Sequence, residues 1–206
     1  MWQTLLHPKH APLRPYLLSP IRLLLCCKFW QTQPSEFPVT SAHLYAELTT
    51  AFYEWKQEWV IASQEQRQRL SRLLGELGKT LLLEGRSIRD PLSQADMDKI
   101  FGKHSPLLRL AIQLGWVIPR GLVQQEAWQR GYGFFDRTFR DYFTALAIDN
   151  WQFFLDGYQH HYRIFESKWL PVLRFWLGRS DIPNLEKSRF MEALLEFNDH
   201  CSPENF

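Results

Sequence analysis

The stretch Tyr-Gly-Phe-Phe-Asp-Arg-Thr-Phe-Arg-Asp-Tyr-Phe, residues Tyr132–Phe143, decides the fold because two local patterns meet in it. Its first four residues, Tyr132–Phe135, form a strand-like run. Thr138 and Asp141 then have the spacing of a helix-capping box. The apolar residues that follow recur at helical spacing and predict one buried helix face: Phe139, Tyr142, Phe143, Leu146 and Ala147. The stretch therefore predicts a strand followed directly by a capped helix.

The residues before this stretch predict a partner for its strand. Trp116, Val117 and Ile118 are strand formers, and Pro119 and Gly121 follow them as turn residues. Two strand-like runs separated in this way predict a small β-hairpin with an irregular connection.

Three helices are predicted before the hairpin. Ser63 with Gln66 and Ser93 with Asp96 have capping-box spacing, and a serine and proline open a third helix over Ser105–Leu114. The first of these helices has a leucine stripe at helical spacing: Leu70, Leu73, Leu74, Leu77 and Leu81. Three helices followed by a hairpin are the layout of a winged helix.

Two helices are predicted nearer the N-terminus. Ser19 and Pro20 form a strong helix start, and the helix over Ile21–Gln31 is apolar on most sides, so we expect it to be buried. A second helix is predicted over Ser41–Val60. Its apolar face consists of Leu44, Leu48, Phe52, Trp55 and Trp59.

The last part of the chain is also predicted to be helical. Its expected helices are Trp151–Tyr158, Lys168–Leu177 and Leu185–Asp199. The sequence therefore predicts a mainly α protein with one small β-hairpin. Its expected parts are a helical lid segment, a winged-helix-like domain and a C-terminal helical domain, at residues 1–62, 63–149 and 150–206.

The composition of the 206 residues limits the function classes. Hydrophobic residues make up 45% of the chain and charged residues 22%, which is typical of globular proteins and argues against disorder. A net charge of +2 gives no argument for a nucleic-acid or anionic-lipid partner. The apolar run Leu17–Trp30 is too short to span a bilayer, so we expect a cytoplasmic protein with no membrane partner. The aromatic share of 15%, with nine Trp, predicts either a dense core or a docking surface.

No catalytic or metal-binding motif is recognised in the sequence. Gly78, Lys79 and Thr80 match the end of a phosphate-binding P-loop, but position 73 is Leu73 where that motif needs glycine. The triplet also lies inside the predicted leucine-striped helix rather than after a strand. We therefore predict no enzyme activity, no catalytic residues and no metal site in this chain.

Several segments are similar to one protein family. Tyr132–Phe143 resembles the winged-helix signature of NACHT-family signalling NTPases, of the form Phe-x-His-x-Thr-Phe-Gln-Glu-Tyr-Phe. Ser19–Leu23 resembles the Asn-Pro-Leu-x-Leu motif that opens a helix just after the NTPase core in that family. The bacterial NACHT proteins of defence and conflict systems are one similar group. Other similar segments are Leu44-Tyr45, Phe52–Lys56, Leu114–Trp116, Trp151–Leu155 and Tyr162–Arg179.

This resemblance implies the regulatory part of a nucleotide-driven switch of the STAND class. In the family, ADP holds a closed monomer and exchange for ATP opens it, with the motif proline near the adenine and the winged-helix histidine on a phosphate. Pro20 takes the place of that proline, whereas Asp136 stands where the histidine would be. A carboxylate there would repel a phosphate, so ADP sensing in the family's manner is not expected.

The resemblance does not extend to the catalytic core of the family. Nothing in the sequence resembles the P-loop or the Mg-binding acidic strand. We therefore expect no cofactor in this chain itself, and ADP or ATP with Mg only where an NTPase core is present in cis or in trans. The expected function is non-catalytic regulation of such a core in bacterial defence or signal transduction.

Two alternatives follow from the same residues. A free-standing winged-helix DNA-binding protein is the first, although the expected recognition helix Ser105–Leu114 carries a single basic residue, Arg109, so we do not expect a nucleic-acid partner. An enzyme with a pocket around Asp136, Asp141 and His160 is the second, and no spacing supports it.

Overall fold

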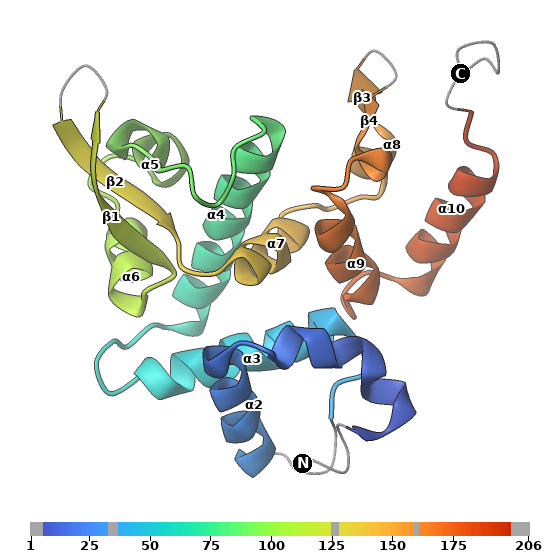
Figure 1. Cartoon of the computed structure of the whole chain (residues 1–206), viewed down its shortest axis with the longest axis horizontal. Coiled ribbons are helices and arrows are strands. Elements are labelled where there is room, and N and C mark those ends of the chain that lie inside the picture. The colour runs from blue at the N-terminus through green and yellow to red at the C-terminus, as the bar shows by residue number, and fades with distance from the viewer. Residues whose placement is uncertain (1–5, 33–36, 125–127, 159–160, 199–206) are drawn as a thin grey trace.

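A computed structural model describes residues 6–32, 37–124, 128–158 and 161–198 of the chain, and these residues are mainly helical (Figure 1). The helices are η1 (Pro8–Leu17), α2 (Pro20–Thr32), α3 (Ser41–Lys56), α4 (Gln64–Leu83), α5 (Gln94–Phe101), α6 (Pro106–Leu114), α7 (Arg137–Leu146), α8 (Gln152–Leu155), η2 (Arg163–Phe165), α9 (Leu170–Gly178) and α10 (Asn184–Leu195). The strands are β1 (Val117–Gln124), β2 (Trp128–Phe134), β3 (Gly157–Tyr158) and β4 (His161–Tyr162).

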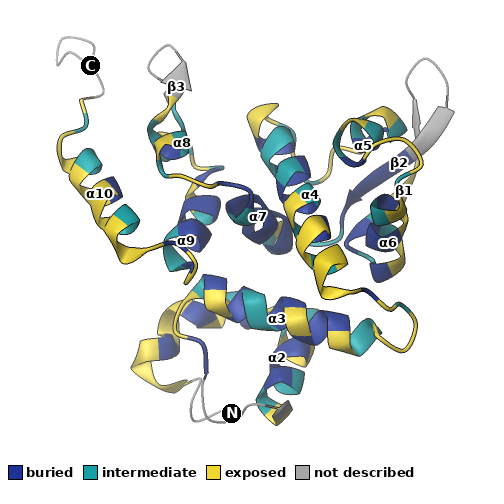
Figure 2. Cartoon of the chain, turned by 180° about the vertical axis from the view of Figure 1, so that it is seen from behind, coloured by how far each residue is buried: buried dark blue, intermediate teal, exposed yellow. Residues whose placement is uncertain are grey.

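Helix α7 lies in the middle of the molecule, and the other elements are arranged around it (Figure 1). It packs against α4, α9 and α3. Helices α5 and α6 lie with the β1–β2 hairpin on the far side of α4, while α2 and η1 pack on α3. Figure 2 shows α7 as almost wholly buried, in contrast to the largely exposed α10.

The predicted hairpin is confirmed. Strands β1 and β2 pair in antiparallel fashion, with Val117 opposite Phe134, and the register shifts between Pro119 and Leu122. Gly121 lies at this irregularity with a φ of 81°, a conformation that suits glycine. A further bridge joins Leu92 to Tyr132, so the segment before α5 is tied to the hairpin.

Both capping boxes predicted for the first two helices of this region are confirmed. The Ser63 hydroxyl accepts from the Gln66 amide at 3.2 Å, and the Gln66 side chain accepts from the Ser63 amide at 2.9 Å. Ser93 and Asp96 make the same pair of bonds at 3.1 and 2.8 Å. At α6 the proline start is present, but the Ser105 hydroxyl makes no capping bond.

Three predictions, for helices α2, α3 and α8, are wrong. Helix α2 is not buried on most sides, because Leu23 and Leu24 are 41% and 45% exposed. Helix α3 ends at Lys56 rather than Val60, which leaves Trp59 66% exposed. The helix predicted over Trp151–Tyr158 stops at Leu155, and the next residues pair as β3 and β4. The proline-broken segment before α2 forms the 3-10 helix η1.

The aromatic residues form a dense core, which is one of the two interpretations of their abundance. Trp116 is fully buried, and its ring centroid lies 4.2 Å from that of Phe52 and 5.1 Å from that of Phe139. The Tyr45 ring extends this group, at 4.8 Å from Phe139 and 4.9 Å from Phe175. The aromatic contacts therefore join α3, α7, α9 and the start of the hairpin.

Helices α4 and α7 approach closely because α4 presents two glycines to α7. A Cβ at Gly75 would collide with the backbone carbonyl of Phe143, and one at Gly78 would collide with the Thr144 hydroxyl. The predicted helical setting of the Gly78-Lys79-Thr80 triplet is confirmed, and packing explains its glycine.

None of the described helices is long and apolar enough to cross a bilayer.

Gly75→Ala tests the contact between α4 and α7. Helix propensity and packing predict changes of opposite sign in the free energy of unfolding. Propensity alone would stabilise the helix by about 1 kcal/mol. We expect a net destabilisation of about 1–3 kcal/mol, since the new methyl meets rigid backbone. Urea unfolding measures the difference. Gln68→Ala on the exposed side of α4 is the control, with a change within about 0.5 kcal/mol, and a stabilised Gly75→Ala variant would contradict the packing.

Candidate functional site

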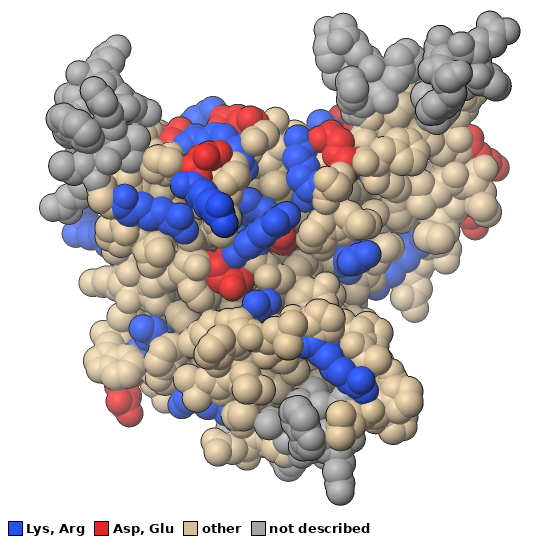
Figure 3. Space-filling model, in the orientation of Figure 1, with Lys and Arg blue, Asp and Glu red and all other residues tan. Residues whose placement is uncertain are grey.

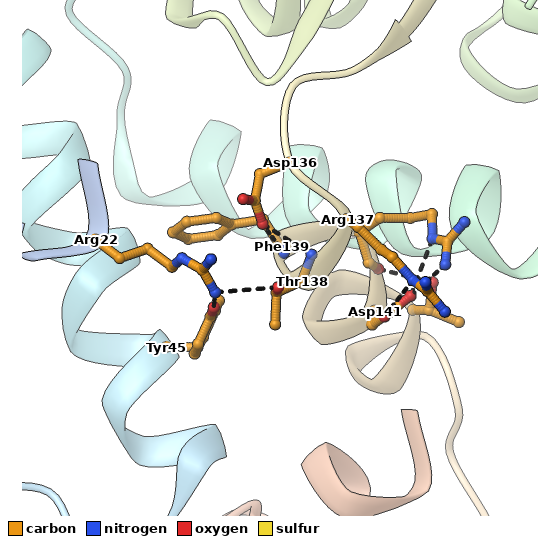
Figure 4. A network of polar contacts seen from close by, with 9 residues as sticks. Arg22, Tyr45, Asp136, Arg137, Thr138, Phe139 and Asp141 are labelled. Atoms are coloured by element: carbon orange, nitrogen blue, oxygen red, sulfur yellow. Dashed lines mark hydrogen bonds and ion pairs between the residues drawn. The ribbon is translucent and has the colours of Figure 1, made fainter. Parts of the chain in front are cut away.

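The start of α2 and the start of α7, which carry Pro20 and Asp136, come together beside α3 (Figure 4). Asp136 is the N-cap of α7: its Oδ1 accepts hydrogen bonds from the backbone amides of Thr138 at 2.8 Å and Phe139 at 3.1 Å. The capping box predicted for Thr138 and Asp141 is therefore wrong. The helix begins two residues earlier than that box would allow, and a carboxylate suits a helix N-terminus.

Asp141 instead forms a buried ion pair with its neighbour. The Arg140 Nε and Nη2 atoms donate to the Asp141 Oδ1 at 2.9 and 2.6 Å, and both side chains are 3% exposed. Arg137 lies farther away, at 3.9 Å from the other carboxylate oxygen. Burial raises the pKa of Asp141, and the charge and hydrogen bonds of Arg140 oppose this shift. The pair is structural, since removing one partner would leave a buried charge uncompensated.

Arg22 connects α2 to both neighbouring helices. Its Nη1 donates to the Tyr45 hydroxyl at 3.0 Å and to the Thr138 hydroxyl at 3.2 Å (Figure 4). Tyr45 is fully buried, and burial raises the pKa of its phenol to about 12, although Arg22 opposes this shift. The network therefore joins one residue from each of α2, α3 and α7.

Pro20 is the exposed first residue of α2, two positions before Arg22. The structure thus brings the helix that Pro20 opens next to the start of α7, through Arg22 and Thr138. The predicted buried face of α7 is confirmed at Phe139, Tyr142 and Phe143.

Asp136 does not fit the role of a phosphate-binding donor. An ionised carboxylate only accepts hydrogen bonds, and one oxygen of Asp136 already accepts two from the helix N-terminus. A donor such as the family's histidine could reach a phosphate, whereas Asp136 would repel it.

The C-terminal end of α7 has polar partners that sequence reasoning missed. Arg179 Nη1 donates to the carbonyl oxygens of Ala145 at 2.6 Å and Ile148 at 3.0 Å, and the Trp176 indole also donates to Ile148 at 3.1 Å. Asp181 pairs with Arg179 at 2.6 Å. The sequence did not reveal these carbonyl contacts of Arg179, because Ala145 and Ile148 lie more than 30 positions away.

A cleft of about 770 Å³ opens beside the Arg22 network. Its walls come from η1, α2, the start of α3, α7 and α9. Three arginines line it: Arg22, Arg137 and Arg174. No sequence signal predicted this group, because the three residues are far apart along the chain and share no motif.

The alternative of an enzyme pocket around Asp136, Asp141 and His160 gains no support. The two carboxylates are engaged in the cap and in the ion pair, and His160 lies outside the described residues. Across the described part of the chain, no three His, Cys, Asp or Glu side chains are grouped to hold a metal ion.

Comparison of the chain with protein-family models, with curated proteins and with solved structures finds no match.

Replacement of Asp136 tests its role as a helix cap. Asp136→Ala is expected to lower the free energy of unfolding by about 1 kcal/mol, because two helix amides lose their acceptor. Asp136→Asn keeps an acceptor oxygen and is expected to stay within about 0.5 kcal/mol of the parent protein. Chemical denaturation measures both. Equal losses in the two variants would show that charge rather than capping matters.

Tyr45 is expected to make stability fall at alkaline pH. Its pKa is about 12 in the folded protein and about 10 in the unfolded chain, so above about pH 10 only the unfolded state loses this proton. Its contribution is complete below about pH 10 and declines by about 1.4 kcal/mol per pH unit until the folded pKa is reached. Tyr45→Phe should therefore show a shallower decline in urea unfolding across this range. Parallel declines in both proteins would contradict the assignment.

Proposed function

We propose that this chain is the non-catalytic regulatory part of a NACHT-type STAND NTPase. Residues 1–62 would be a helical lid, residues 63–149 a winged-helix-like domain and residues 150–206 a C-terminal helical domain. The partner would be a P-loop NTPase core, in cis or in trans, and bacterial defence or signal transduction would be the setting.

The order of elements along the chain is the observation that carries the proposal. Helices α4, α5 and α6 are followed by the β1–β2 hairpin and then by α7. This order agrees with a winged helix. Of the segments that resemble the family, one opens α2 and another covers the end of β2 and most of α7. The hydrogen bond from Arg22 to Thr138 joins these two regions.

Exposed leucines on and before α2 support a docking partner. Leu18 is 83% exposed, and Leu23 and Leu24 are 41% and 45% exposed. They lie on both sides of Pro20, the residue that the resemblance places nearest to the core. Apolar side chains gathered on one segment favour a protein partner, and in the family the segment that opens this helix follows the NTPase core.

The core would supply ADP or ATP binding with Mg, and this chain would respond to it. Arg22 gives a physical route, because a core that moves α2 would pull on the Arg22 bonds to Tyr45 and Thr138. Asp136 would take no part in sensing and would hold the start of α7.

The alternative, a winged-helix DNA-binding protein, has weaker support. Arg109 is the only basic residue of α6, and its guanidinium donates to the carbonyl of His104 at 3.4 Å. On the face drawn in Figure 3, Lys and Arg are interspersed with Asp and Glu rather than gathered over one element. A salt-sensitive mobility shift on duplex DNA would favour this alternative.

Co-expression with a NACHT-type P-loop core, sought first in the reading frame upstream of this gene, tests the proposal. We expect a stable complex by size exclusion with light scattering. Replacement of Leu23 and Leu24 by Asp should abolish it, because charges would enter an apolar interface. Leu195→Asp is the control, since Leu195 is 88% exposed on α10. The proposal fails if no such core is encoded, or if a well-folded core does not associate.

A further inference from the structure

The cleft beside the Arg22 network has the properties of an anion-binding site. We propose that it binds a small molecule bearing two or more phosphate groups. Pro20 and Asp136, the positions that the family resemblance assigns to the nucleotide, are not among the residues that line it. The inference goes beyond the proposed function, because the ligand would bind to this chain without any partner.

Three arginine residues line the cleft from three different helices. Arg22 comes from α2, Arg137 from the first turn of α7 and Arg174 from α9. The one carboxylate among the described lining residues is Asp141, which is 3% exposed and already held by Arg140. The wall therefore has a net positive charge, and guanidinium groups suit phosphate oxygens in both charge and geometry.

The donors of these arginines are partly unused. The Arg22 Nε is buried and has no hydrogen-bond partner within the described ranges. Its Nη1 makes both bonds of the network, which fixes the side chain in place. Arg174 is exposed and has no ion pair with any residue that the structure describes, and Arg137 has only the 3.9 Å contact with Asp141. A bound anion would supply acceptors for the exposed donors of Arg137 and Arg174.

The start of α3 adds to the positive character of the cleft. Thr40, its N-cap, and Ser41, its first residue, both line the cleft. The amide groups at a helix N-terminus are a favourable environment for an anion. The Ser41 and Thr138 side chains place hydroxyl groups in the same wall, where they can donate to phosphate oxygens.

The shape of the site favours a small molecule over a protein segment. The volume of about 770 Å³ lies in the range of small-molecule pockets. Apolar and aromatic residues of η1 also line the cleft, among them Pro12, Leu13 and Tyr16. A lining of arginines together with such residues suits a ligand with a multiply charged end and an uncharged part.

Isothermal titration of the full chain with sodium tripolyphosphate at low ionic strength tests the proposal. We expect one site per chain, with affinity that falls as salt is added. Arg174→Gln and Arg137→Gln should each weaken binding by about tenfold. Both side chains are exposed, so the variants should fold, and circular dichroism melts check this. Arg69→Gln, an equal loss of charge on α4 outside the cleft, should leave the affinity unchanged.

Two further ligands identify the group that is recognised. Equal affinity for ADP and tripolyphosphate would support recognition of the phosphate groups alone. Tighter binding of ADP would support recognition of the phosphates together with a contribution from the apolar lining residues. A short polyglutamate peptide that displaced tripolyphosphate at equal concentration would overturn the proposal in favour of an acidic protein segment. Absence of binding, or equal loss in Arg69→Gln, would also overturn it. All these measurements use the chain alone, so they stand apart from the association test.

Discussion

The burial of α7 on nearly every side is the constraint on which the rest of the structure depends. A fully enclosed helix needs partners for its polar groups, because unpaired ones are costly away from water. Asp136 accepts from amides at the start of α7, and Arg179 and Trp176 donate to carbonyls at its end. The buried Arg140 is satisfied by Asp141. The packing of α4, α3 and α9 around α7 is possible because these groups are satisfied.

The two sides of α7 are filled in different ways. On the side facing α4, the two helices approach closely because Gly75 and Gly78 have no side chains. Toward α3 and α9 the contact is made by large rings, with Phe139 against Tyr45 and Tyr142 against Phe175. One helix therefore serves as the shared core of elements that precede and follow it along the chain.

The sequence predicted those features whose cause is local. The Ser63 and Ser93 capping boxes, the leucine stripe of α4 and the β1–β2 hairpin depend on residues close together in the chain, and each is confirmed. One local feature was misassigned: the spacing of Thr138 and Asp141 allowed a cap, but Asp136 caps α7 and Asp141 pairs with the neighbouring Arg140. Features that depend on distant contacts were missed. The arginines of the cleft come together only through folding, so no spacing could reveal them.

Arg22 links the two proposals, because its guanidinium belongs to both the network and the cleft. Nη1 holds α2 to α3 and α7, while Nε has no partner among the described residues. An anion bound in the cleft would favour the orientation of Arg22 that also makes the α2–α7 contact. Coupling between two binding events is reciprocal. A core that displaced α2 would therefore lower the affinity for the anion. The bound anion would disfavour the displacement of α2 by the same factor.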